Sequence, residues 1–179
     1  SLEDEVRDMD RKVDEALKRL RDESKKVHDD NKREIDKLRK ESEDVHRENK
    51  ETLDRLRERG LDERLLEEVR RRSEDLHRRN EKILREVIKV SKEIHDRNKE
   101  LLDRLKERVR DVKSKLRRVD KDAVRELKRD VERIIKEVDE LVKRSIEESR
   151  RITEEVARRV KETIDRSRKI TKELRDRAD

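Results

Sequence analysis

Apolar residues recur along the chain at spacings of three and four positions, with charged residues between them. This spacing places them on one stripe of an α-helix, and it predicts helical structure throughout. The stripe repeats every 18 residues, as Val27 with Val45 and Ile35 with Leu53 illustrate. Eighteen residues fill about five helical turns, so the pattern predicts nearly straight helices rather than supercoiled ones.

Short signals mark where the helices begin and end. Ser1 and Asp4 form a predicted capping box at the start of the first helix. Gly60 is the only glycine, and it suits the left-handed position that ends a helix. Leu61 supplies the apolar residue that follows such an end, and Asp62 is the predicted N-cap of the second helix.

A second turn is predicted at Val119 and Asp120, which repeat the pattern of an apolar residue followed by a capping aspartate. This turn lacks a glycine, so one helix running uninterrupted through it is the alternative. The predicted helices are 2–59, 62–117 and 120–178. Short turns make neighbouring helices antiparallel. We therefore expect an all-α fold, a straight antiparallel up-down-up three-helix bundle that forms a single domain over the 179 residues.

The composition is unusual for a folded protein. Charged residues make up 60% of the chain and apolar residues 27%, and aromatic residues, Cys and Pro are absent. Such an excess of charge usually indicates disorder, because too little apolar surface can be buried. Here the charged residues include many Glu, Lys and Arg, which favour helices, so a folded chain is expected. The absence of Cys excludes disulfides and thiolate metal sites.

The net charge of +6 arises from 57 basic and 51 acidic residues that alternate at helical spacings. This mixture predicts solvated, salt-bridged surfaces rather than a basic stripe, so we expect no nucleic acid partner. No apolar run approaches the ~20 residues of a membrane span, and no signal peptide is recognisable. We therefore expect a soluble, unprocessed chain that does not enter a membrane.

The chain places all of its His and Asn residues in four copies of one block. Within each block a serine, a histidine and an asparagine stand at offsets of 0, 4 and 7, on the stripe that carries the apolar residues, so they are predicted to point inward. The four blocks are Ser24, His28, Asn31; Ser42, His46, Asn49; Ser73, His77, Asn80; and Ser91, His95, Asn98.

The spacing of these blocks supports the antiparallel arrangement. The midpoint between His28 and His95 equals the midpoint between His46 and His77, and it falls in the turn beside Gly60. Each histidine is therefore predicted to face a histidine, and each serine an asparagine. The third helix carries hydroxyl residues that we expect to complete both layers. They are Ser145, Ser149, Thr163 and Ser167, with Thr153 and Thr171 in the same series.

Buried Ser, His, Asn and Thr side chains can satisfy one another without charge, so the pattern predicts two buried hydrogen-bond networks that fix the register of the helices. A serine beside a histidine also occurs in nucleophilic catalysis, but pocket glycines and oxyanion donors are missing, so we expect no enzyme. Paired imidazoles with amides and hydroxyls form a poor zinc site, so we expect no metal and no other cofactor. Buried neutral histidines predict weaker networks in acid.

The repeated Ser24, His28 and Asn31 block, the hydroxyls of the third helix and the Asp-capped turns resemble computationally designed helical bundles with parametric backbones and buried hydrogen-bond networks. The resemblance covers the whole chain. It implies a synthetic scaffold or assembly component without a natural substrate, and some members of this class are built as pH-responsive or heteromeric parts.

We expect a monomer with a structural role and no small-molecule ligand. The alternative is a binding or assembly module, because the second helix has a wider apolar stripe than the first. This stripe contains Ile83, Leu84, Val87, Ile88, Leu101 and Leu102, with Val90 off its centre. A spectrin-like repeat is a third candidate, although no aromatic residue is present to anchor it.

Overall fold

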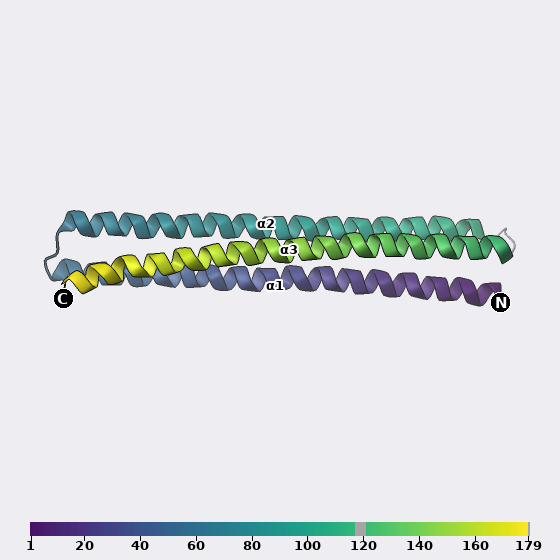
Figure 1. The fold of residues 1–179 in the computed structure, drawn as a ribbon, viewed down its shortest axis with the longest axis horizontal. Helices are drawn as coiled ribbons and strands as arrows, with labels where there is room; N and C mark the ends of the chain where they lie inside the picture. Colours follow the sequence, from purple (N-terminus) through teal and green to yellow (C-terminus); the bar gives the residue numbers. More distant parts are fainter. Residues whose placement is uncertain (117–120, 179) are drawn as a thin grey trace. The chain divides into compact units, whose positions relative to one another are not determined.

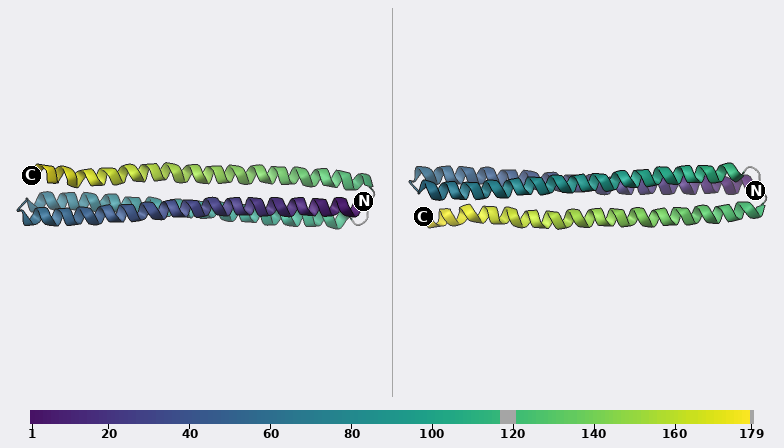
Figure 2. Two further views of the ribbon diagram at one scale, coloured as in Figure 1. Left: turned by 90° about the horizontal axis from the view of Figure 1, so that it is seen from below. Right: turned by 90° about the horizontal axis from the view of Figure 1, so that it is seen from above.

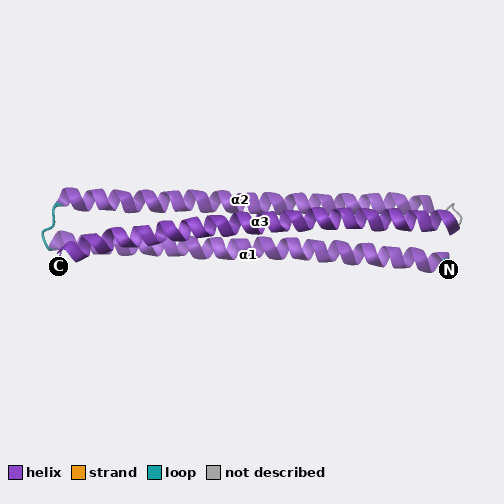
Figure 3. Cartoon of the chain, viewed as in Figure 1, coloured by secondary structure: helices purple, strands orange, loops and turns teal. Residues whose placement is uncertain are grey.

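The protein folds into three α-helices in a computed structural model that describes residues 1–116 and 121–178 (Figures 1 and 3). Helix α1 spans Leu2–Glu58, α2 spans Glu63–Leu116 and α3 spans Lys121–Ala178. The described residues contain no strand, and each helix packs against both others. The predicted all-α three-helix bundle is confirmed.

The contacts within the chain divide it into two compact units. Unit 1 comprises Ser1–Asp29 and Ser91–Arg150, and unit 2 comprises Asp30–Val90 and Arg151–Asp179. Each unit takes one segment from each helix, and within each unit these segments run alongside one another in every view (Figures 1 and 2). The single domain and the straight course of the helices stay predictions.

Ion pairs show that α1 and α3 are parallel within each unit. In unit 1, Nζ of Lys12 lies 3.8 Å from Oε1 of Glu132, and Nη2 of Arg19 lies 3.1 Å from Oδ1 of Asp139. The residue numbers rise together in both helices, which requires the same direction. Unit 2 shows the same relation between Glu34 and Lys161 and between Glu41 and Arg168.

Helix α2 runs in the opposite direction to α1. In unit 1, Ser24 contacts His95 while His28 contacts Ser91, so residue numbers fall along α2 as they rise along α1. The corresponding contacts in unit 2 are Ser42 with His77 and His46 with Ser73. The up-down-up order is thus present in each unit, and one uninterrupted helix in place of α2 and α3 is wrong. The predicted turn residues Val119 and Asp120 lie outside the described residues.

The end of α1 forms the left-handed helix stop that Gly60 predicts. Gly60 has a φ of 86°, a conformation that L side chains rarely adopt. Its backbone N–H donates to the carbonyl of Arg57 at 3.0 Å, and the N–H of Leu61 donates to the carbonyl of Leu56 at 3.2 Å. These are the two hydrogen bonds of a Schellman motif. The side chain of Leu61 also packs against the apolar cluster that contains Leu56, which closes the helix end.

Capping side chains start α1 and α2 as expected. The hydroxyl of Ser1 accepts a hydrogen bond from the backbone N–H of Asp4 at 3.3 Å, and the Asp4 carboxylate lies 3.7 Å from the terminal amino group of Ser1. These reciprocal contacts form a capping box. At α2, Oδ1 of Asp62 accepts from the N–H of Arg64 at 3.2 Å. Asp62 is therefore the N-cap.

Apolar side chains fill the interior of each unit next to its polar residues. Unit 2 has two apolar clusters: the first includes Leu38 and Leu84, and the second includes Leu53 and Leu66. In α1, the polar positions from Ser42 to Asn49 fall between Leu38 of the first cluster and Leu53 of the second, with Val45 of the first cluster among them. Unit 1 has one apolar cluster. Its buried members are Met9, Val13, Leu17, Leu20, Leu102, Leu105, Val109, Val131, Ile134, Val138 and Val142.

We predict that Gly60→Ala lowers the free energy of unfolding by about 1 kcal/mol, because alanine pays a steric cost at positive φ. A Cβ at this position meets no atom within 4 Å, so the loss comes from the backbone conformation alone. Urea denaturation followed by circular dichroism measures it. Gly60→Asn is the matched control and should lose less, since asparagine tolerates left-handed φ. Equal stability of Gly60→Ala and the parent chain would contradict the argument.

Candidate functional site

The buried polar residues of unit 1 come from all three helices. Ser24 and His28 lie on α1, Ser91, His95 and Asn98 lie on α2, and Ser149 lies on α3, and all of them are buried. His28 is 6% exposed and His95 is 7% exposed. Their positions follow from helical spacing, because residues four and seven apart lie on the same face of a helix.

Two serine–histidine contacts join α1 to α2 in unit 1. Oγ of Ser24 lies 2.7 Å from Nδ1 of His95, and Nδ1 of His28 lies 2.7 Å from Oγ of Ser91. Asn98 donates from Nδ2 to Oγ of Ser24 at 3.2 Å. The two imidazole rings stack between these contacts, with centroids 5.4 Å apart and planes inclined by 18°. Each histidine therefore faces the other and also contacts the serine of the opposite helix.

The same arrangement occurs in unit 2. Oγ of Ser42 lies 2.9 Å from Nδ1 of His77, and Nδ1 of His46 lies 3.0 Å from Oγ of Ser73. Asn80 donates from Nδ2 to Oγ of Ser42 at 3.2 Å. The His46 and His77 rings stack with centroids 5.1 Å apart and an inclination of 13°. Unlike the rings of unit 1, these two rings are half-buried.

Asn49 connects all three helices of unit 2. From Nδ2 it donates to Oγ of Ser73 on α2 at 2.9 Å, and to Oγ and the backbone carbonyl of Ser167 on α3 at 2.9 and 3.2 Å. Its Oδ1 accepts from the hydroxyl of Thr171 at 2.8 Å. Both ends of this amide are therefore satisfied, as a buried side chain that is 3% exposed requires.

The contacts of the His77 ring favour a proton on Nε2. Asn80 donates to Oγ of Ser42, and the serine hydroxyl can donate its own proton to Nδ1 of His77. Nε2 lies 3.4 Å from a carboxylate oxygen of Glu81, a position that also favours a proton on this nitrogen. This tautomer is assigned from the surrounding contacts.

The environment of His46 favours its neutral form. Burial lowers the pKa of His46, and the positive charge of Lys50 and the neighbouring His77 lower it further. Glu74 raises this pKa in part, and Arg70 lowers it. Desolvation is the largest of these causes, so the neutral imidazole is the form that the folded protein stabilises.

The structure separates the predicted hydroxyl residues of α3 into two groups. Ser149 and Ser167 are buried, whereas Ser145 and Thr163 are half-buried. The Thr163 hydroxyl donates to the backbone carbonyl of Arg159 in its own helix at 3.0 Å, and Thr171 takes the inward position instead. The remaining predicted residue, Asn31, is buried and belongs to unit 2.

Sequence reasoning missed the cross-helix serine–histidine contacts and the role of Thr171. A signal for the first exists, because serine precedes histidine by four residues in every block, so the two helices can exchange these contacts reciprocally. A signal for the role of Thr171 is its 18-residue spacing from Thr153, and both side chains are buried. The 18-residue spacing identifies such pairs, but it does not show which pair faces inward.

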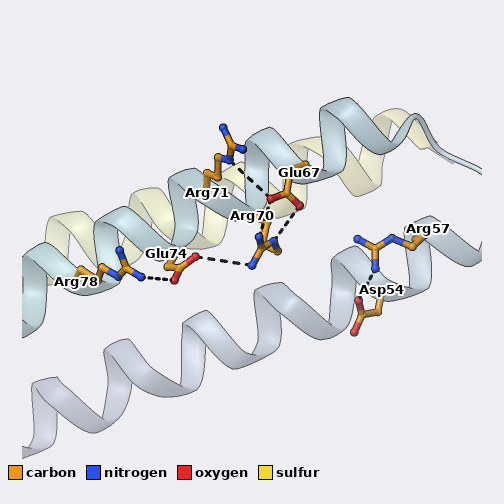
Figure 4. Close-up of polar contacts among 7 residues, drawn as sticks. All are labelled: Asp54, Arg57, Glu67, Arg70, Arg71, Glu74 and Arg78. Carbon is orange, nitrogen blue, oxygen red and sulfur yellow. Dashed lines mark hydrogen bonds and ion pairs between the residues drawn. The ribbon is translucent and has the colours of Figure 1, made fainter.

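On the outside of unit 2, charged residues pair along the helices (Figure 4). The guanidinium of Arg70 donates to both carboxylate oxygens of Glu67, at 2.6 and 3.1 Å, and these hydrogen bonds lower the pKa of Glu67. Glu74 accepts from Arg78 at 2.7 Å and lies 3.8 Å from Arg70. Exposed pairs of this kind contribute little to stability. They account for much of the interleaved charge in the sequence.

Comparison with known proteins gives no relative from which a function could be transferred. No family model, curated protein or solved structure matches the chain. Within residues 1–116 and 121–178, no three His, Cys, Asp or Glu side chains gather as a metal site would require. The helices of the described part also contain no stretch long and apolar enough to cross a membrane.

We predict that Asn49→Ala lowers the free energy of unfolding by about 2–4 kcal/mol, because it removes the hydrogen bonds that connect Asn49 to Ser73, Ser167 and Thr171. Asn80→Ala is the matched control. Asn80 is also buried in unit 2, but it makes one cross-helix hydrogen bond, so a loss of about 1 kcal/mol is expected. Chemical denaturation measures both values, and losses of equal size would show that the Asn49 connections add nothing.

Proposed function

We propose that this chain is a non-catalytic structural scaffold, a designed helical bundle whose buried polar networks fix the register of its helices. The observation that carries the proposal is the position of Asn49. Its amide binds Ser73 on α2 and both Ser167 and Thr171 on α3 at one level of unit 2. A side chain that joins three helices at one height supports a role in setting their relative positions.

The energetic basis is the cost of misalignment. Sliding one helix of a unit by one turn, about 5.4 Å, would break the cross-helix hydrogen bonds of its network. Each buried polar group left without a partner costs ~1–3 kcal/mol, and one network contains several such groups. Apolar clusters made of Leu, Val and Ile tolerate such a shift better, because these side chains carry no directional contacts.

The surroundings of the serine–histidine pairs support a role without catalysis. Ser24 is 4% exposed and its contact, His95, is 7% exposed. The cavity beside them has a volume of about 10 Å³, roughly the space of one water molecule. A substrate could not reach the Ser24 hydroxyl without separation of the helices.

The repetition of one geometry supports a designed origin. The serine–histidine distance is 2.7 Å for both pairs of unit 1, and 2.9 and 3.0 Å for the pairs of unit 2. The imidazole stacks are also alike, with centroid distances of 5.4 and 5.1 Å. Such reuse of one polar module is a feature of the designed bundles that the sequence resembles.

We predict that removal of the unit 2 network preserves helicity but loses a unique register. Ser and Thr would be replaced by Val, and His and Asn by Leu. Spin labels at Glu48→Cys and Arg71→Cys then report the α1–α2 distance. We expect one narrow distance in the parent chain, and further distances displaced by up to about one turn, ~5 Å, in the apolar variant. The replaced residues are Ser42, His46, Asn49, Ser73, His77, Asn80, Ser167 and Thr171.

The matched control for this experiment is Leu38→Met, a volume-conserving change inside the apolar cluster next to the network, which should leave the distance distribution unchanged. A single unaltered distance in the apolar variant would refute the register role, because apolar packing alone would then set the register.

The scaffold is also proposed to weaken in mild acid. The pKa of His46 is lower in the folded chain than its unfolded value of ~6.5, so unfolding takes up protons in this range. The stabilising contribution is complete above the unfolded pKa and declines as the pH falls through the folded pKa. The apolar clusters on both sides of the network oppose complete unfolding.

We predict that the free energy of unfolding is lower at about pH 5.5 than at about pH 7.5. In the unfolded chain His46 binds a proton more readily, because the burial and nearby positive charge that oppose protonation in the folded chain are absent. Carboxylates contribute little over this interval, since their ordinary pKa values lie near 4. Urea denaturation at the two pH values measures the difference. His46→Asn is the control and should show a smaller difference. An identical pH dependence in the two proteins would remove His46 as the cause.

A further inference from the structure

Helix α2 carries a line of apolar residues outside the core of unit 2. Leu65 and Ile83 are each 38% exposed, Val90 is 36% exposed, and Leu76 is half-buried. In chain order they are Leu65, Leu76, Ile83 and Val90, with spacings of 11, 7 and 7 residues, which places them on one line along the helix. Leu65, Ile83 and Val90 are three of the four large apolar side chains that are exposed in the described chain. This concentration on one face requires an explanation beyond scattered surface leucines.

Helix α3 carries a matching line. Ile152, Thr163 and Ile170 are half-buried, and they are separated by 11 and 7 residues. Leu76 of α2 and Ile170 of α3 line the same cavity of unit 2, which has a volume of about 450 Å³. Since α2 and α3 are antiparallel, seven residues forward from Leu76 and seven residues back from Ile170 place Ile83 and Thr163 at one level. The two lines therefore lie side by side at these two levels, and the surface that they form around the cavity is here called the α2–α3 groove.

The rim of this groove carries an excess of positive charge. The cavity is bordered by two acidic residues, Asp75 and Glu173, and by four basic ones, Arg72, Arg79, Arg166 and Lys169. Among the described residues, none of these four cations has an ion-pair partner, whereas Arg70 and Arg78 on the same stretch of α2 are paired (Figure 4). The unpaired cations favour an occupant that brings carboxylates.

We propose that the α2–α3 groove of unit 2 binds an amphipathic α-helix of another protein, with acidic residues flanking its apolar stripe. A helix suits the groove because apolar residues at seven- and eleven-residue spacings present one ridge every two to three turns. Thr163 lies within the apolar line, and its hydroxyl already donates to the carbonyl of Arg159 in its own helix, so it leaves no unsatisfied donor at this level. A second copy of this chain fits poorly, because an isologous contact would bring the four cations together.

This proposal goes beyond the scaffold role, since it concerns the outside of unit 2 and not the buried networks. Fluorescence anisotropy with the full chain tests it. The probe is a labelled peptide of about four heptads with Leu at the apolar positions and Glu at the flanking positions, and the matched probe carries Lys in place of Glu. The acidic peptide should bind at least about tenfold more tightly than the basic peptide, and added salt should weaken it.

Two variants make the test specific to the groove. Ile83→Asp should weaken the acidic peptide at least about tenfold, whereas Leu141→Asp, at a 48% exposed position on α3 in unit 1, should leave binding unchanged. Arg79→Glu with Arg166→Glu should reverse the preference between the two peptides. Circular dichroism verifies that each variant stays helical. Equal binding of the two peptides or unchanged binding by Ile83→Asp would overturn the proposal. Light scattering that shows a dimer for the parent chain and a monomer for Ile83→Asp would also overturn it, because a second copy would then occupy the groove.

Discussion

Polar groups buried in these networks are stabilised by hydrogen-bond partners inside the protein, and this preference sets the heights of the helices within each unit. Hydrophobic burial brings the helices together, but it is not directional. Apolar residues recur along the whole length of α1, so several alignments would bury similar apolar area. The Ser24–His95 and Ser42–His77 contacts remove this freedom, since each forms at one alignment of α1 and α2.

Much of the fold could be predicted because its signals are local or periodic. Gly60 and Asp62 specify a helix stop and a helix start by their own backbone preferences. The pairing of His28 with His95 followed from the 18-residue repeat and the position of the turn. Both inferences need residue numbers only, and neither depends on how far each helix is rotated about its axis.

The remainder depends on helix rotation, which the sequence does not specify. Thr163 and Thr171 are both hydroxyl residues on the apolar side of α3, yet Thr171 binds Asn49 while Thr163 binds its own backbone. The difference between them is a rotation of the helix by a fraction of a turn. The orientation of α2 is not specified either: Leu76 lines a cavity with Ile170 and Ile83 is 38% exposed, so the wide apolar stripe of the second helix was visible in the sequence while its direction was not.

The stacked histidines also provide built-in spectroscopic reporters. The chain lacks Phe, Trp and Tyr, so its four imidazoles are its only aromatic rings. In D2O, where exchangeable amide and guanidinium protons are replaced, their ring carbon-bound protons therefore occupy the aromatic region of a proton magnetic resonance spectrum without overlap from other side chains. One stacked pair belongs to each unit, so the state of each network can be observed separately, without labels or added probes.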